Sequence, residues 1–175
     1  MSGAVILPYR DILPRIHPDA FIAPGAVVIG DVEIAAGANI WYNCVLRGDV
    51  ASIYIGENTN IQDGTVVHVS TGKPGTRIGA NVTVGHMALV HAATVEDGAF
   101  IGMKACLLDG STVEKEGMLA AGALLTQGKR VPTGELWAGN PAKLLRPLKD
   151  EERAYIYVSA EHYAELGREH KEAVG

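Results

Sequence analysis

The chain has 175 residues, the usual length of one domain, and 47% of them are hydrophobic, which argues against intrinsic disorder. A net charge of −5 without a block of like charges excludes an obvious nucleic-acid partner. Only two Phe and two Trp accompany 21 Gly, a composition that favours short strands and tight turns over a helical bundle. The N-terminus lacks the features of a signal peptide and no apolar run approaches about 18 residues, so we predict a cytoplasmic protein without a membrane span.

Apolar residues recur at every sixth position over most of the chain. An α-helix cannot produce this period, because six residues turn it by about 600° and leave successive apolar residues on different faces. Single amphipathic strands show a period of two over a short run. Hexads are typical of parallel β-helices, in which each hexad forms one short strand and a corner. The residues predicted to point inward are Ile22, Val28, Ile34, Ile40, Leu46, Ile55, Ile61, Val67, Ile78, Val84, Val90, Ile101, Leu107, Val113, Leu119, Leu125, Val131 and Trp137.

The repeat resembles that of the hexapeptide-repeat family, whose coils are left-handed, triangular and three hexads long. We therefore predict an all-β fold, with a left-handed parallel β-helix over residues 1–147. Ile55, Ile61 and Val67 then begin the first, second and third sides of one coil, and the following coils repeat this order.

Three irregularities interrupt the hexads. Three residues are extra near Ala51, five are extra around segment 72–76, and the step that follows Val90 is one residue short. Loops that interrupt a solenoid tend to gather on one face, which is often the functional one.

The hexad pattern ends after Trp137 and gives way to a helical pattern. Asp150 can cap a helix, and the two glutamates that follow it suit the first turn. We predict a C-terminal helix within residues 148–175 that packs on the β-helix or reaches a neighbouring subunit. Its apolar positions, which recur at helical spacing, are Ile156, Tyr163 and Leu166.

Two of the six histidines come into register when the hexads are counted. His68 follows Val67 and His91 follows Val90, so the two occupy the same position on the third side, one coil apart. Stacked parallel strands lie about 4.8 Å apart. Two nitrogens bound to one tetrahedral zinc lie about 3.3 Å apart, a gap that a tilt of the side chains can close. The pair is therefore a candidate for two ligands of one metal.

Further polar residues surround this pair. Arg47 precedes His68 by one coil, and on the second side Asp63 and His86 occupy equivalent positions. Because the second and third sides of one prism face different directions, one chain cannot easily bring all three histidines to one metal. A cyclic homotrimer places the second side of one subunit against the third side of the next. We therefore predict a site with His68 and His91 from one chain and His86 from its neighbour.

Several motifs around these histidines resemble those of the γ-class carbonic anhydrases. The similar segments are WYNCVLRGD at 41–49 and NIQD at 60–63, within a resemblance that covers about residues 16–147. The resemblance implies a lyase with Zn²⁺, or Fe²⁺ or Co²⁺, between subunits, and CO₂ and bicarbonate as substrates. Three neutral imidazoles leave one open position on zinc and lower the pKa of a bound water to around 7. The resulting hydroxide would attack CO₂.

The same resemblance implies roles for five further residues. Arg47 and Asp49 would pair across the subunit interface. Gln62 and Asp63 would hold the metal-bound water or the bicarbonate, and Tyr163 of the C-terminal helix would close the pocket. A structural role for Asp63, in an ion pair at the subunit interface, is an equally good interpretation.

One departure from the family affects the expected rate. The most active members carry an acidic loop whose glutamate shuttles the proton, whereas segment 72–76 offers only Lys73 and no carboxylate. We therefore predict that CO₂ hydration is limited by proton transfer. Three other functions stay open: a hexapeptide-repeat acyltransferase that uses one histidine as a general base toward a CoA thioester, a thioesterase at the same metal site, and a non-catalytic trimeric scaffold held together by metal.

Overall fold

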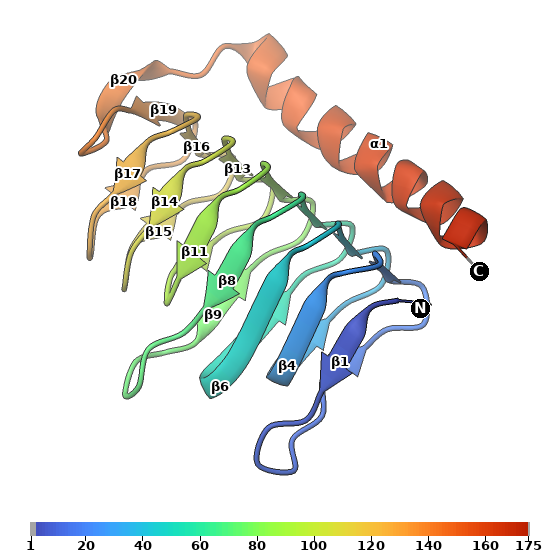
Figure 1. Cartoon of the computed structure of the whole chain (residues 1–175). Coiled ribbons are helices and arrows are strands. Elements are labelled where there is room, and N and C mark those ends of the chain that lie inside the picture. The colour runs from blue at the N-terminus through green and yellow to red at the C-terminus, as the bar shows by residue number, and fades with distance from the viewer. Residues whose placement is uncertain (1–2, 175) are drawn as a thin grey trace.

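A computed structural model, which describes residues 3–174, forms a parallel β-helix followed by one long helix (Figure 1). One sheet covers the first and third sides of the coil. It contains β1 (Val5–Leu7), β2 (Arg15–Ile16), β4 (Val27–Ile34), β6 (Val45–Ile55), β8 (Val66–His68), β9 (Thr76–Ile78), β11 (Leu89–His91), β12 (Thr94–Val95), β14 (Cys106–Leu107), β15 (Thr112–Val113), β17 (Leu124–Leu125) and β18 (Arg130–Val131). The long strand β6 joins the two sides, because it pairs with β8 on the third side and with β9 on the first.

A second sheet forms the second side of the coil. It contains β3 (Phe21–Ile22), β5 (Asn39–Ile40), β7 (Asn60–Ile61), β10 (Thr83–Val84), β13 (Phe100–Ile101), β16 (Met118–Leu119), β19 (Glu135–Ala138) and β20 (Lys143–Pro147). Its strands are parallel except for β20, which turns back antiparallel to β19 and ends the coil.

The hexad register predicted from the sequence is confirmed. On the second side, Ile61 pairs with Val84, and Val84 pairs with Ile101. The predicted inward residues are at most 1% exposed, apart from the partly buried Trp137 in the last coil. Stacked aliphatic side chains therefore form one continuous core, and they fix which residues of successive coils lie side by side.

Two of the interruptions lie at the corner that follows the third side. Within β6 the register shifts, since Gly30 pairs with Gly48 but Val32 pairs with Ile53, which accommodates the three extra residues. The five extra residues form the loop between β8 and β9. Thr76 at the end of this loop donates a hydrogen bond of 2.5 Å to the carbonyl of His68, which closes its base.

The corners impose their own period of six on the backbone. Residues 98, 104, 110, 116, 122, 128 and 134 all have positive φ, and five of these seven are glycine. Gly85 is needed for a different reason. Its φ is ordinary, but a Cβ at this position would lie 2.7 Å from the backbone nitrogen of Met103 in the next coil.

Helix α1 (Asp150–Val174) runs back along the second side toward the N-terminal end (Figure 1). The helix packs on the β-helix: Ile156 is fully buried, and Tyr163 and Leu166 pack against an aromatic cluster around Trp41. Among residues 3–174, no helix combines the length and apolar character needed to cross a membrane.

The predicted N-cap of α1 is wrong by one residue. Asp150 is the first helical residue, and Glu152 makes the capping bond by accepting the backbone N–H of Lys149 at 2.9 Å. Glu152 is available for this role because Arg146 of β20 binds both of its carboxylate oxygens. Residues 1, 2 and 175, which the predicted parts 1–147 and 148–175 include, lie outside the described residues.

The close approach at Gly85 generates a stability prediction. Gly85→Ala should lower the free energy of unfolding by about 1–3 kcal/mol, because backbone atoms of the next coil must move to admit the methyl group. Gly122→Asn is the control, since Gly122 has positive φ but open space around it, and Asn tolerates that conformation. Urea unfolding at one protein concentration measures both variants. Equal midpoints for Gly85→Ala and the parent would contradict the predicted crowding.

Candidate metal centre

His68 and His91 lie side by side on the third side of the coil. They are register partners on β8 and β11, directly after the buried Val67 and Val90, so the predicted stacking is confirmed. Their ring centroids are 5.1 Å apart. Nδ1 of His68 lies 3.1 Å from Nε2 of His91, which is close to the spacing of about 3.3 Å between two nitrogens on one tetrahedral zinc.

A carboxylate holds the outer nitrogen of each ring. His68 donates from Nε2 to Asp49 Oδ1 at 3.1 Å, and His91 donates from Nδ1 to Asp109 Oδ1 at 2.7 Å. Burial tends to raise the pKa of Asp49, but hydrogen bonds from Arg47 and His68 lower it below the ordinary value. The pKa of Asp109 is lowered by hydrogen bonds from Ser70 and His91.

These contacts determine which way the lone pairs of the two histidines point. A neutral imidazole has a single N–H, and both ionised carboxylates accept that proton from the outer nitrogens. The two inner nitrogens are then both acceptors, and they face each other at 3.1 Å. Two opposed lone pairs at this distance favour a cation between them. Histidines backed by carboxylates are also the usual ligand arrangement at metal sites in proteins.

His68 and His91 have no third possible metal ligand beside them among the described residues. Within residues 3–174, no three side chains of His, Cys, Asp or Glu are grouped so that they could hold one ion. His86 lies elsewhere, at the corner after β10, where its Nδ1 is 2.9 Å from Asp63 Oδ2. The predicted stacking of Asp63 with His86 is thus confirmed, and within the chain Asp63 orients His86. Its role toward bound water or bicarbonate stays a prediction.

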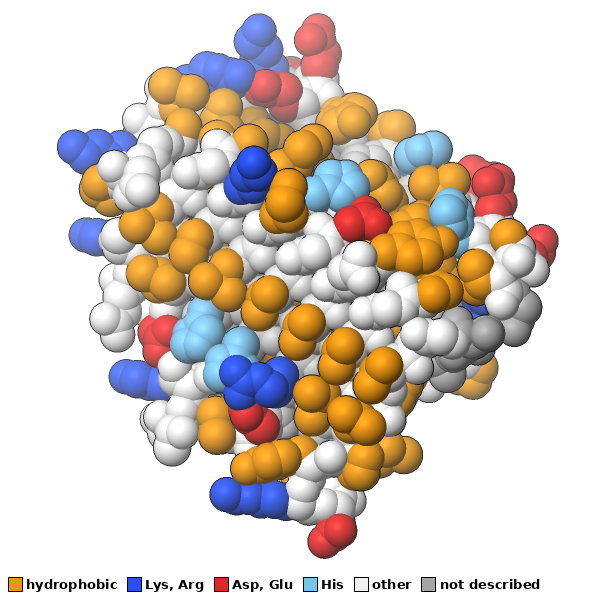
Figure 2. Space-filling model, viewed as in Figure 1, with side chains coloured by type: hydrophobic (Ala, Val, Ile, Leu, Met, Phe, Trp, Pro, Cys, Tyr) orange, Lys and Arg blue, Asp and Glu red, His pale blue; other side chains and the backbone are white. Residues whose placement is uncertain are grey.

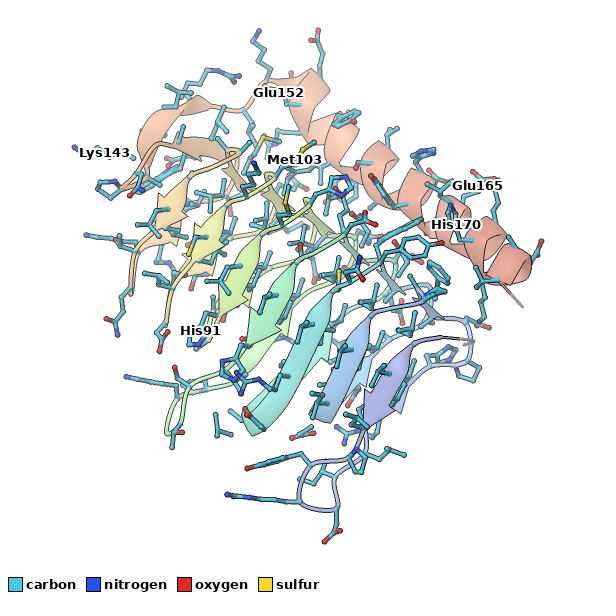
Figure 3. The ribbon with its side chains drawn as sticks, in the orientation of Figure 1. His91, Met103, Lys143, Glu152, Glu165 and His170 are labelled. Carbon is cyan, nitrogen blue, oxygen red and sulfur yellow. The ribbon has the colours of Figure 1, made fainter. Side chains whose placement is uncertain are left out.

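The pictures show the separation of the histidines. Figure 2 shows histidine side chains at separate places on one face, one group amid both acidic and basic side chains. In Figure 3, His91 lies on the part of the coil away from α1, whereas Met103, which lines one pocket together with His86, lies beside α1.

Arg47 and Asp49 pair within the chain. Both belong to β6, and Nη1 of Arg47 contacts Oδ2 of Asp49, the carboxylate oxygen that His68 does not use. Arg47 therefore holds the carboxylate that holds His68. The expected pairing of these two residues across a subunit interface stays a prediction.

Gln62, His86 and Tyr163 line one pocket between the second side and α1. The pocket has a volume of about 420 Å³, and most of its lining is apolar. Gln62 is 4% exposed. It donates from Nε2 to Asn60 Oδ1 at 2.9 Å, and Asn60 itself donates to Thr83. This orientation leaves the Oε1 atom of Gln62 as an acceptor. Burial raises the pKa of Tyr163, whose ring packs edge-on against Trp41.

Asp109 and its partner Ser70 are site residues that the hexad pattern did not indicate. Counting along the third side reached Leu108, the residue that follows the inward Leu107, and ended there because Leu108 is apolar. Asp109 lies one residue further on, at the corner, and its side chain reaches back to His91. The offset of two residues that identified Asp63 and His86 on the second side would have found Asp109 on the third.

Comparisons with known proteins agree with the repeat fold. A model of the bacterial transferase hexapeptide family (six repeats) matches residues 14–48. A solved structure of a hexapeptide transferase family protein from Anaplasma phagocytophilum is 50% identical, with a TM-score of 0.91 over 96% of this chain and 98% of that one. The class is therefore that of the hexapeptide-repeat proteins.

Sequence relatives narrow the class to a family. Gamma carbonic anhydrase 2 of Arabidopsis thaliana, described as mitochondrial, is 56% identical over 91% of this chain, which spans 59% of the relative's length. Protein YrdA of Escherichia coli K12 is 43% identical over 91% of this chain and 90% of its own length. The chain belongs to the γ-class carbonic anhydrase family.

Proposed function

We propose that this chain is a metal-dependent lyase that hydrates CO₂ reversibly to bicarbonate, at sites shared between the subunits of a homotrimer. The observation that carries the proposal is the pair of opposed histidine nitrogens, each backed by a carboxylate. The names of the sequence relatives support the reaction. Zn²⁺ fits the imidazole ligands, and Fe²⁺ or Co²⁺ are alternatives.

The positions of the three histidines support a site shared between chains. His68 and His91 offer two nitrogens on the third side of the coil, and His86 lies on the second side against Asp63. A cyclic trimer brings these two sides of neighbouring chains together three times, so each metal would receive two ligands from one chain and one from the next.

The side chains around such a site have separate tasks. His68 and His91 of one chain and His86 of the next would hold the zinc, which would supply a bound water with a pKa lowered to around 7. Asp49 and Asp109 keep the outer nitrogens of the histidines protonated, so that their inner nitrogens are free to bind. Gln62, whose amide is fixed by Asn60, presents Oε1 to accept a hydrogen bond from the attacking group or from the hydroxyl of bicarbonate.

The chain has few side chains suited to removing the proton that the reaction releases. The loop between β8 and β9 contains Lys73 and no carboxylate at 72–76. Tyr163 is a poor relay, because burial moves its pKa further above neutral pH, and acid–base groups work best when their pKa is near the working pH. We infer that buffer carries the proton away and limits the rate.

A specific observation favours a thioesterase as the second candidate. The pocket beside His86 has a volume of about 420 Å³ and apolar walls that include Phe100, Met118 and Leu136. Pockets of roughly 300–1,000 Å³ suit ligands far larger than CO₂, so an acyl group would fit here. Assays with CO₂ and with acyl-CoA thioesters on the same metal-loaded protein distinguish the two functions.

The first functional prediction concerns metal content. His86→Ala should reduce bound metal at every site to near zero, because each site loses its ligand from the neighbouring chain. Elemental analysis of purified protein measures this, and light scattering checks the trimer. His17→Ala, which removes an exposed histidine paired with Asp19, should keep the full complement. A full complement in His86→Ala, or metal bound to a monomer, would rule out the shared site.

The second functional prediction concerns proton transfer. At fixed pH and ionic strength, the rate of CO₂ hydration should rise with imidazole concentration, roughly tenfold or more before it levels off. Stopped-flow measurements on metal-loaded protein test this. A high rate that does not depend on buffer would contradict the inference and indicate an internal relay. No rate at any buffer concentration, with metal fully bound, would favour the thioesterase or the scaffold.

A further inference from the structure

We propose that Ser70 and Asp109 are a positioning pair that fixes the ring of His91 for metal binding, and that the inserted loop between β8 and β9 serves to place Ser70. The proposal rests on the metal site proposed above, and it assigns a task to the loop between β8 and β9, which has no carboxylate at 72–76.

The contacts are short and specific. His91 donates from Nδ1 to Asp109 Oδ1 at 2.7 Å, and the hydroxyl of Ser70 donates to the other oxygen, Oδ2, at 2.6 Å. The three residues come from three segments: β11, the corner after β14, and the loop after β8. Since each carboxylate oxygen has its own donor, the carboxylate cannot turn without breaking a bond, and neither can the ring that it holds.

Ser70 lies where the inserted loop begins. Ser70 lies three residues after the inward Val67. In the next two coils the residues at this offset are Ala93 and Gly110, which carry no hydroxyl. The loop that begins here is closed at its base by the bond from Thr76 to the His68 carbonyl. The loop that carries Ser70 is therefore anchored at the end of β8, the strand that supplies His68.

The neighbouring histidine has the same arrangement of partners. Asp49 accepts from His68 at one oxygen and contacts Arg47 at the other, just as Asp109 accepts from His91 and from Ser70. Each ring thus donates to a carboxylate whose second oxygen contacts another side chain, Arg47 or Ser70. The surface pair of His17 and Asp19 differs, because its side chains are largely exposed and 3.7 Å apart.

Substitutions in the positioning pair should weaken metal affinity by amounts that can be estimated. In Asp109→Asn the amide can turn its NH₂ group toward His91, which favours the tautomer with a proton on the inner nitrogen and opposes metal binding. Loss of such an outer partner typically weakens metal affinity by about 10–100-fold. Ser70→Ala should weaken it less, by a few-fold, because the carboxylate remains but is less firmly held.

The experiment is a competition titration of the assembled protein with Zn²⁺ and a chelator of known affinity. The variants are Asp109→Asn, Ser70→Ala and the double variant, with Asp19→Asn as the matched control for a surface His–Asp pair. Thermal unfolding of the metal-free proteins is measured in parallel. We expect the Kd for Zn²⁺ to rise in the first two, and to be no higher in the double variant than in Asp109→Asn, since Ser70 acts through Asp109.

The outcomes separate this inference from the proposed function. If Asp109→Asn binds Zn²⁺ with the parent Kd, the positioning pair is overturned and the metal site stays intact. If Asp109→Asn does not fold, the parent Kd in Ser70→Ala overturns the pair in the same way. A higher Kd for Zn²⁺ that is matched by lower stability of the metal-free protein also overturns the positioning pair, because the two residues would then have a structural role. No binding of Zn²⁺ by the parent protein would overturn the proposed function itself.

Discussion

The parallel register between neighbouring coils is the constraint on which the candidate site depends. Val67 and Val90 are fully buried and stacked, and a shift of one residue would turn these side chains outward. The cost of exposing the aliphatic core therefore holds His68 opposite His91. No polar contact has to bring the rings together, and the polar contacts serve only to orient them.

Orientation comes mainly from the corner that follows the third side. Both long interruptions of the repeat lie there, one within β6 and one after β8. Asp49 and Ser70 stand at the same offset, three residues after Leu46 and Val67, at the start of the two interruptions. A regular coil would turn at this point. The extra residues instead let Asp49 reach His68 and Ser70 reach Asp109, whereas Asp109, which holds His91, comes from an uninterrupted hexad.

Much of this arrangement could be predicted from the sequence, since hexads report directly on burial. The inward residues, the stacking of His68 on His91 and of Asp63 on His86, and the packing of the C-terminal helix follow from counting residues. Asp109 could not be found in the same way, because a corner residue can reach sideways to an adjacent column. The mistaken cap at Asp150 has a similar cause: Glu152 could cap only because Arg146, on a strand outside the repeat, holds it.

The central claim is that each metal site combines two chains, and mixed trimers test it most directly. His86→Ala chains keep His68 and His91, whereas His68→Ala chains keep His86, so neither alone should bind metal. Differently tagged chains, co-expressed and purified through both tags, give trimers in which one of the three sites has all its ligands. We expect metal at about one third of the parent level in these mixed trimers. Mixed trimers without metal, under conditions in which the parent is fully loaded, would contradict it.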